Sequence, residues 1–343
     1  MMSMRRIKRA EVWIFAEQRH GILSEVSFEL LNRGEKLAEK LNSPLVSVIL
    51  GYNIKKEDID ELISRGADKV LVVDNKHLEN FLVEPYVRVL TSLLDEYNPH
   101  IFIAAATTLG RTLMPYIAIK KKTGLTADCT VLDIEEGTDN LLQTRPAIGG
   151  NILATIKTPN TRPQMATVRP HSTKPALPDR NRKGEVIYKE YDDEIFKSRT
   201  KFIEFIKDES QQVTMQDAKI VVSAGRGIGK KEKFKMIDEL ADILGGAVGA
   251  SRDVVDRGWK TYPHQIGLSG KTISPLLYIA NGISGSVQHI AGIQTSENII
   301  AINKDPDAQI FKLANLSIVG DLHEIVPLLI ERIKEYKARK AKK

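Results

Sequence analysis

The chain has 343 residues, 42% hydrophobic and 27% charged, which excludes disorder, collagen-like repeats and coiled coil and is long enough for two domains. Its net charge of +6 comes from the two ends: residues 1–10 and 334–343 together contribute +9, which leaves −3 for the part between them. A nucleic-acid-binding surface over the body is therefore excluded. A contact of the Lys-rich end with an anionic lipid surface or an acidic partner stays open.

The sequence predicts a cytoplasmic protein. No run of about 18 apolar residues occurs, and the basic start is not followed by the apolar region of a secretory signal. Cys129 is the only cysteine, so neither an internal disulfide nor an iron–sulfur cluster held within this chain is expected. The seven histidines form no pair at metal-ligand spacing, so no metal site is predicted.

The first part of the chain alternates between buried strands and amphipathic helices. This alternation predicts βαβ units and an α/β domain with a largely parallel sheet. The expected strands are 11–16, 45–50, 69–73 and 100–106, and the expected helices are 26–41, 56–64 and 84–96.

The character of the sequence changes after Asp133. Short β-prone segments (141–144, 151–155 and 164–168) precede a Pro-rich stretch at 169–178, which cannot continue a helix or a central strand. Charged sequence then continues to about residue 210, and a new βαβ series begins at Ala218. The predicted domains are 1–210, 211–335 and a basic tail, 336–343.

The second domain opens with a strand, 219–224, that runs into the glycine-rich turn Gly-Arg-Gly-Ile-Gly at 225–229 and then a helix at 234–244. Glycines let a backbone approach a phosphate, and a helix N-terminus favours an anion. The spacing is G-x-G-x-G rather than the dinucleotide pattern G-x-G-x-x-G. A tight turn without a ligand therefore explains this segment nearly as well.

Further strands in this domain also end in polar residues. Strand 275–280 runs into a second glycine-rich turn at 281–289, strand 298–302 ends at Asn303, and strand 316–320 ends at Asp321, whose carboxylate could accept from ribose hydroxyls. Carboxyl ends of parallel strands meet at one edge of a sheet, where nucleotides bind. These loops are therefore expected to face one elongated nucleotide.

The motifs along both domains closely resemble those of the electron transfer flavoprotein α subunit, over the whole chain. In the second domain they are Gly-Ala-Ser-Arg at 249–252, Leu-Ser-Gly-Lys at 268–271, Leu-Tyr-Ile-Ala at 277–280, Gly-Ile-Ser-Gly-Ser-Val-Gln-His at 282–289, Ala-Ile-Asn-Lys-Asp-Pro at 301–306 and Ile-Val-Gly-Asp at 318–321. In the first they are Val-Trp-Ile-Phe-Ala-Glu at 12–17, Thr-Gly-Leu-Thr-Ala-Asp-Cys at 123–129 and Arg-Pro-Ala-Ile-Gly-Gly-Asn at 145–151.

The resemblance implies two α/β domains: an N-terminal parallel-sheet domain of the adenine nucleotide α-hydrolase-like kind, and a C-terminal doubly wound domain that binds FAD. It places Arg226 and Ser251 beside the pyrophosphate, and Asn303 and Asp321 at the adenosine end. The phosphates and ribityl chain would be met by Gly282, Ser284, Gly285, Ser286 and Gln288. Taken alone, Arg226 could be a surface ion-pair residue and Asp321 a helix cap.

Four further residues are placed at the flavin ring by the same resemblance. Arg252 would lie against the ring and His289 at its O2 edge, where positive charge favours the reduced flavin. Ser269, where the family commonly has threonine, would hydrogen-bond at N5, and Gln265 would lie nearby. His289 alone would more often be a core or capping residue. Asn315, where many members carry aspartate, is assigned no role.

The implied function is an FAD-binding subunit that relays single electrons, with no catalytic side chain in the chain itself. Its implied partners are the electron transfer flavoprotein β subunit, dehydrogenases, and a quinone- or ferredoxin-linked oxidoreductase, with membrane contact only through a partner. Residues 145–151 would shape the β-subunit interface and 205–215 would act as a hinge. Electron bifurcation stays open.

Two other classes remain as alternatives. An NAD-dependent dehydrogenase would also use a parallel sheet, but it should show G-x-G-x-x-G and an acid about 20 residues further on. A non-catalytic nucleotide-binding module would explain the phosphate loops. It would not explain a cation and a histidine placed for a redox ring.

Overall fold

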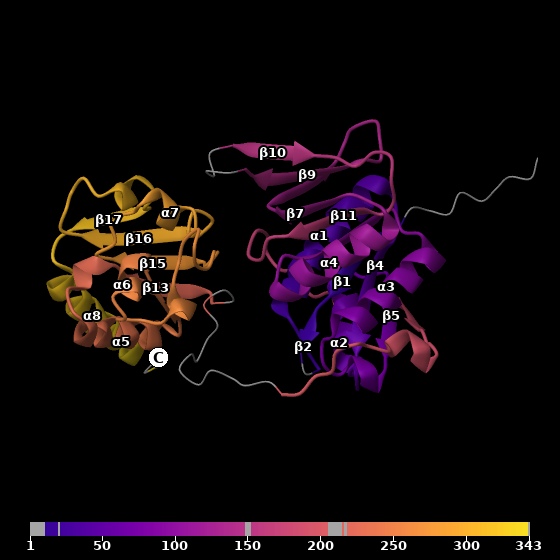
Figure 1. The fold of residues 1–343 in the computed structure, drawn as a ribbon, viewed down its shortest axis with the longest axis horizontal. Coiled ribbons are helices and arrows are strands. Elements are labelled where there is room, and N and C mark those ends of the chain that lie inside the picture. Colours follow the sequence, from indigo (N-terminus) through magenta and orange to yellow (C-terminus); the bar gives the residue numbers. More distant parts are fainter. Residues whose placement is uncertain (1–10, 20, 148–151, 205–214, 216–217, 342–343) are drawn as a thin grey trace, which may run out of the picture. The chain divides into compact units, whose positions relative to one another are not determined.

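The computed structural model describes residues 11–19, 21–147, 152–204, 215 and 218–341. The chain divides into two compact units, Met1–Phe205 and Ile206–Lys343, called unit 1 and unit 2 below. Each unit has its own parallel sheet and its own apolar cores (Figure 1). The predicted class, α/β with parallel sheets, is confirmed.

Unit 1 is built on a seven-stranded sheet in the order β12-β5-β4-β1-β6-β11-β7, with every pairing parallel. Its strands are β1 (Val12–Ala16), β4 (Leu45–Gly51), β5 (Lys69–Asp74), β6 (Ile101–Ala105), β7 (Leu125–Cys129), β11 (Gln164–Val168) and β12 (Glu185–Tyr188). Its helices are α1 (Glu25–Leu41), α2 (Lys56–Ser64), α3 (Val83–Tyr97) and α4 (Thr108–Lys121).

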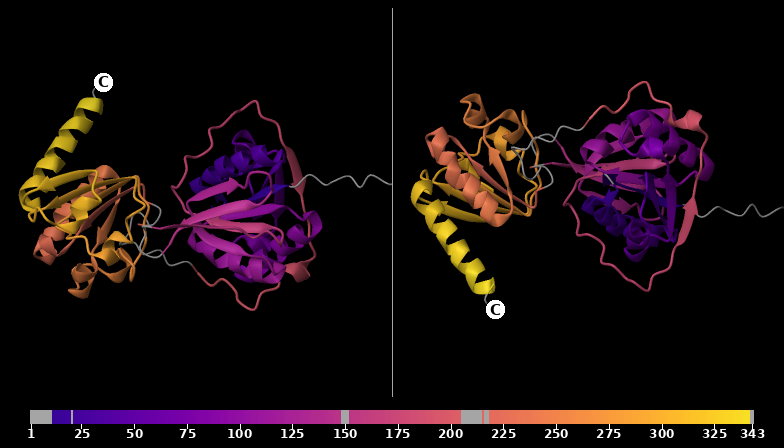
Figure 2. Two further views of the ribbon diagram at one scale, coloured as in Figure 1. Left: turned by 90° about the horizontal axis from the view of Figure 1, so that it is seen from above. Right: turned by 90° about the horizontal axis from the view of Figure 1, so that it is seen from below.

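Helices cover both faces of this sheet, and Figure 2 shows it edge-on between them. Alternate residues of β1 explain why: Val12 and Ile14 pack with residues of α1 and α2, whereas Trp13 and Phe15 pack with residues of α3 and α4. A strand buried on both faces reads as a continuous apolar run, which is why β1 could be predicted from the sequence.

Some parts of unit 1 were not predicted. Helix α4 contains Pro115, a residue that discourages a helix, and β12 lies in the charged segment, where no strand was predicted. Antiparallel strands β8 (Val131–Ile134), β9 (Leu141–Pro146) and β10 (Leu153–Ile156) form a separate sheet, and β2 (Gln18–Arg19) pairs with β3 (Ile22–Leu23). The Pro-rich stretch 169–178 is neither helix nor strand, as predicted.

Unit 2 carries a five-stranded sheet in the order β14-β13-β15-β16-β17, again parallel throughout. Its strands are β13 (Ile220–Ala224), β14 (Ala247–Ala250), β15 (Leu277–Asn281), β16 (Asn298–Asn303) and β17 (Leu316–Val319). Its helices are α5 (Lys235–Leu244), α6 (Arg252–Asp256), α7 (Val287–Ile290) and α8 (Leu322–Ala341). When the five strands are numbered along the chain from β13, their order across the sheet is 2-1-3-4-5. The chain therefore changes direction across the sheet between β13 and β15.

Apolar side chains of α5 and α8 pack against one face of this sheet, in a core with Val222 and Ile279. The opposite face is covered by residues from loops, among them Ile266, Ile283 and Ile310. Residues 336–341, which the sequence set apart as a basic tail, continue α8 (Figure 2). Doubly wound sheets bind ligands at the carboxyl ends of the strands where the strand order reverses. In unit 2 this position lies between β13 and β15.

Candidate cofactor-binding site

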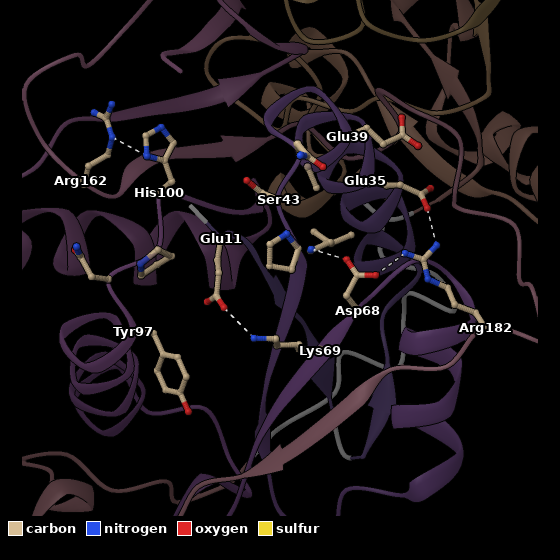
Figure 3. A pocket seen from close by; sticks show the side chains of 16 residues that line it. Glu11, Glu35, Glu39, Ser43, Asp68, Lys69, Tyr97, His100, Arg162 and Arg182 are labelled. Atoms are coloured by element: carbon tan, nitrogen blue, oxygen red, sulfur yellow. Dashed lines mark hydrogen bonds and ion pairs between the residues drawn. The ribbon is translucent and has the colours of Figure 1, made fainter. Parts of the chain in front are cut away.

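Unit 1 contains a cavity of about 1110 Å³ at the amino ends of its strands. Charged side chains that line it pair with one another, as Figure 3 shows. Lys69 Nζ lies 3.1 Å from Glu11 Oε1, and the Arg182 guanidinium lies 2.8 Å from Glu35 Oε1 and 3.1 Å from Asp68 Oδ1. The Arg182–Asp68 pair joins the segments before the neighbouring strands β12 and β5, and the Glu11–Lys69 pair joins the segment before β1 to the start of β5. We therefore assign them to the architecture of unit 1 rather than to a ligand.

A second cavity, of about 470 Å³, lies in unit 2 at the carboxyl ends of β13, β14 and β15. This is the point where the strand order reverses, the place at which doubly wound sheets bind nucleotides. Its lining residues are Gly225, Arg226, Ser251, Arg252, Asp253, Asp256, Ile266, Gly267, Ser269, Gly282, Ile283, Ser284, Gly285, Ser286, Gln288 and His289. All the predicted contact residues are among them except Gln265, Asn303 and Asp321.

The two glycine-rich turns pack directly against each other. Gly225 N–H donates to Asn281 O at 2.9 Å, and Gly227 N–H donates to Gly282 O at 3.1 Å. A Cβ at Gly225 would lie 2.5 Å from Gly282 O, and Gly282 itself has a φ of +59°. The need for glycine at 225 and 227 therefore comes from backbone packing. The tight-turn explanation holds for these two positions, and the packed turns form one wall of the cavity.

The second turn is held in place by hydrogen bonds on both sides. Ser284 O accepts from Ile310 N–H at 3.1 Å, and Gln288 O accepts from Leu268 N–H at 2.9 Å. The Ser286 hydroxyl oxygen caps the start of α7 by accepting from His289 N–H at 3.4 Å. These contacts fix a rim of hydroxyls and backbone amides around the cavity without a ligand.

Two arginines and two carboxylates also line the cavity. Arg252 Nε lies 3.3 Å from Asp256 Oδ2, and Arg226 Nε lies 4.0 Å from Asp253 Oδ2. The side chains of Arg226 and Arg252 are 72% and 70% exposed, so each can leave its carboxylate. Sequence analysis missed both aspartates, although the four-residue spacing from Arg252 to Asp256 on one helix face was a usable signal.

Gln265 lies behind Ser269 rather than in the cavity wall. The Gln265 side chain is buried, and its Nε2 donates to Ser269 O and Ser269 Oγ, both at 3.0 Å. Ser269 lines the cavity and is exposed. Gln265 therefore positions the loop that carries Ser269, and its place by the ring stays a prediction.

Asn303 and Asp321 are engaged in local contacts outside the cavity lining. Asn303 Nδ2 donates to Ile283 O at 2.9 Å. Asp321 Oδ1 accepts from His323 N–H at 2.9 Å at the start of α8, and Oδ2 pairs with Lys304 at 2.9 Å. The amide of His323 and the charge of Lys304 hold the pKa of Asp321 below its ordinary value. Asp321 thus caps the N-terminus of α8, as the alternative reading of its sequence position predicted.

His289 lines the cavity but is almost completely buried. Its Nε2 lies 2.8 Å from the hydroxyl of Tyr278, which is buried in β15. Burial lowers the pKa of His289 to about 4; the Ile266 backbone offsets this in part, yet Nδ1 has no partner in good hydrogen-bond geometry among the described residues. The imidazole is therefore neutral at pH 7.

The groups around this cavity fit a phosphate-containing flavin nucleotide. Serine hydroxyls, glycine-turn amides and two releasable guanidinium groups suit phosphates. An unpartnered imidazole nitrogen is a costly feature for a protein interior, and an acceptor atom of a ligand would relieve it. Fold and cavity together define a doubly wound nucleotide-binding protein with a buried histidine, bonded to Tyr278 through Nε2, in its ligand site.

Comparison with known proteins identifies the family. Residues 12–194 match the electron transfer flavoprotein domain, and residues 214–294 match the electron transfer flavoprotein FAD-binding domain. The electron transfer flavoprotein subunit alpha of Thermoanaerobacterium thermosaccharolyticum is 51% identical over 329 residues, covering 95% of this chain and 98% of the relative. The chain therefore belongs to the electron transfer flavoprotein family, as an α subunit whose cofactor is FAD.

Two further relatives show the range of this family. The electron transfer flavoprotein subunit alpha of Clostridium acetobutylicum is 47% identical and covers 94% of this chain and 96% of the relative. The lactate dehydrogenase (NAD(+),ferredoxin) subunit LctC of Acetobacterium woodii is 41% identical, and the alignment covers 94% of this chain and 76% of the relative. Electron transfer flavoprotein α subunits pair with a β subunit, which supports the predicted pairing of this chain with a β subunit.

Two findings concern other kinds of site. Among the residues that the structure describes, no group of three or more His, Cys, Asp or Glu side chains could hold a metal ion. No helix in the described part of the chain combines the length and apolar character that crossing a membrane requires. Cys129 is buried and free, and burial raises the pKa of its thiol to about 12, so it is protonated at pH 7.

Proposed function

We propose that this α subunit works in the cytoplasm and relays single electrons from dehydrogenases to a quinone- or ferredoxin-linked oxidoreductase, with its FAD in the unit 2 cavity. The observation that carries the proposal is the position of that cavity, at the strand-order reversal within the segment that matches the FAD-binding family. FAD supplies the electron-transfer chemistry when bound. The chain's own residues hold it and set its potential.

We assign the contact residues by the chemistry of each rim. Arg226, Ser251 and the turn at 282–288 would bind the phosphates and ribityl chain, because they offer cations, hydroxyls and backbone amides. Arg252, Ser269 and His289 would meet the ring, with Gln265 holding Ser269. Asn303 and Asp321 would lie at the adenosine end, next to the loops whose backbone they now engage. No side chain in this set needs to act as a general acid, base or nucleophile.

The β-subunit interface and the hinge remain proposals. We assign the interface to residues 145–151, of which 148–151 lie outside the described residues; the described part ends β9, beside the edge strand β10 with its exposed Leu153. The proposed hinge, 205–215, falls almost wholly outside the described residues. With it, the domain limits would be 1–210 and 211–335, followed by the basic residues 336–343 on the end of α8.

Purification of the α–β complex tests the main proposal. We expect it to contain FAD, and dehydrogenase substrate plus the matching dehydrogenase should bleach the flavin absorbance. Electron relay is then measured by adding an artificial acceptor and following reoxidation. A complex that stays colourless when FAD is added would contradict the proposal. So would a flavin that no dehydrogenase reduces.

Electron bifurcation is a second candidate, favoured by one comparison. The printed name of the Acetobacterium woodii relative contains both NAD(+) and ferredoxin. We infer that a complex of this chain could couple the same two carriers through a second flavin in the β subunit. Flavin stoichiometry distinguishes the two: two FAD per heterodimer favours bifurcation, whereas one FAD with one AMP favours the simple carrier.

A further inference from the structure

His289 is hydrogen-bonded to a residue to which the sequence motifs assign no role. Tyr278 lies in β15 with no solvent exposure, and its hydroxyl oxygen lies 2.8 Å from His289 Nε2. The two rings are tilted against each other, with centroids 6.2 Å apart. A buried hydrogen bond between two side chains fixes the orientation of both, because leaving either group without a partner is costly.

The hydrogen bond also decides which nitrogen of His289 carries the proton. Burial, partly offset by the nearby Ser223 hydroxyl, raises the pKa of Tyr278 above its ordinary value, so the phenol keeps its proton. The phenol can donate that proton to His289 Nε2. A neutral imidazole whose Nε2 accepts must hold its own proton on Nδ1. Nδ1–H is then a donor, and among the described residues Nδ1 has no partner in good hydrogen-bond geometry, although the Ile266 backbone lies close enough to affect the pKa of the ring.

We propose that Tyr278 is a positioning residue of the FAD site: through Nε2 it holds His289 as the neutral Nδ1–H tautomer, so that the imidazole offers the bound cofactor one hydrogen-bond donor and no fixed charge. This inference rests on the proposed function of the cavity. It divides the work at the ring between two residues. Arg252 brings the positive charge, and His289 brings a directed N–H bond.

The tautomer can be read without any cofactor. ¹⁵N spectra of the full-length α subunit with labelled histidines report which nitrogen of each ring is protonated, and loss of one set of signals in His289→Gln assigns His289 among the seven histidines. We expect His289 to be protonated on Nδ1 alone. In Tyr278→Phe, which keeps the ring but removes the hydroxyl, we expect the proton to be shared between both nitrogens. A wild-type signal with the proton on Nε2 would overturn the inference, whether or not any variant folds.

The effect on the cofactor is measured in the α–β complex. Tyr278→Phe should raise the Kd for FAD roughly tenfold, the equivalent of about 1.4 kcal/mol, and lower the flavin midpoint potential. In a His289→Gln background the same change should alter the Kd less than about twofold, because the residue acts through the histidine. Equal effects in both backgrounds would show a merely structural role and reject the inference.

Tyr86→Phe is the matched control. Tyr86 is also a buried tyrosine with a hydroxyl hydrogen bond, to Leu78 O at 3.0 Å, but it lies in α3 of unit 1. It should lose a similar amount of stability and leave the His289 spectrum and the flavin potential unchanged. If the wild-type complex binds no FAD, the proposed function fails, while the histidine spectrum still tests the Tyr278–His289 pair.

Discussion

The two parallel sheets of this chain each carry a cavity, but at opposite ends of the strands. In unit 1 the cavity lies at the amino ends, beside Asn42 and Asn98, which cap the C-termini of α1 and α3. In unit 2 it lies at the carboxyl ends, where strands β13, β14 and β15 turn toward the elements that follow them. The larger cavity is the one in unit 1, so size does not mark the cofactor site.

What differs is how the polar groups are used. At the amino ends the helix C-termini present carbonyl groups, and the charged side chains there are paired with one another, as in Glu11–Lys69 and Arg182–Asp68. At the carboxyl ends the rim keeps hydroxyls, glycine turns and exposed guanidinium groups that a ligand can engage. The amino ends of the strands in unit 1 thus carry a cluster of structural ion pairs, whereas the carboxyl ends of the strands in unit 2 carry the candidate binding site.

Gly225→Ala should break the binding side of this comparison most strongly. The new Cβ would lie 2.5 Å from Gly282 O, so the two turns must separate, at a cost of about 1–3 kcal/mol to unit 2 and with loss of FAD from the complex. Denaturant unfolding and FAD fluorescence measure both effects. Gly229→Ala is the control: its Cβ meets nothing within 4 Å, and only its φ of +84° penalises it, by about 1 kcal/mol. Tight FAD binding by Gly225→Ala would contradict the packed-turn interpretation.

Arg252→Ala should lower the flavin midpoint potential by tens of millivolts. In the proposed assignment Arg252 brings positive charge to the flavin ring, and ~1.4 kcal/mol of lost stabilisation of the reduced form corresponds to about 59 mV for one electron. Spectroelectrochemical titration of the α–β complex measures the shift. Arg257→Ala is a matched control, because Arg257 pairs with Asp253 on the same helical segment but does not line the cavity. Equal shifts in both variants would remove the special role of Arg252.

Asp256→Asn should shift the potential in the opposite direction and by less. The Asp256 carboxylate lies 3.3 Å from Arg252 Nε and partly neutralises it, so its removal leaves more positive charge at the cavity. Both side chains are largely exposed, which limits the effect to a fraction of that of Arg252→Ala. The same titration measures it. A lowered potential would mean that Asp256 mainly positions Arg252.

The strand-end loops of unit 2 could be predicted from sequence because parallel strands bring their carboxyl ends to one edge. That rule alone predicts that the turns at Gly225 and Gly282 lie at the same site. It could not show whether a polar side chain at a strand end faces the ligand or its own loop. Asn303 and Asp321 both satisfy nearby backbone amides or carbonyls, which is an equally good use of the same groups.

Burial was the other quantity that the sequence could not supply. A histidine in a serine- and glycine-rich turn gives no sign that its ring is buried against Tyr278 of β15, or that this burial lowers its pKa. In unit 1, β12 is an edge strand with mostly exposed residues, and an exposed strand lacks the apolar run that identified β1.

Arg182→Ala tests the architectural side of the comparison and has the smallest expected effect. Arg182 bridges Glu35, Asp68 and the carbonyl of Gly66, at distances of 2.8, 3.1 and 2.6 Å. Its side chain is 29% exposed, so solvent screens the network and its loss should cost unit 1 about 1 kcal/mol. Hydrogen exchange of unit 1 amides detects such a change. Arg332→Ala, which breaks an exposed pair with Glu335 on α8, should change stability by less than half as much.

The FAD content and the flavin potential of the Arg182→Ala complex should equal those of the wild type. The reason is that Arg182 is paired with groups of unit 1, and none of these partners lines the unit 2 cavity. A changed flavin potential would show that the amino-end cluster does more than hold strands together. The contrast between the two ends of the sheets would then no longer separate architecture from binding.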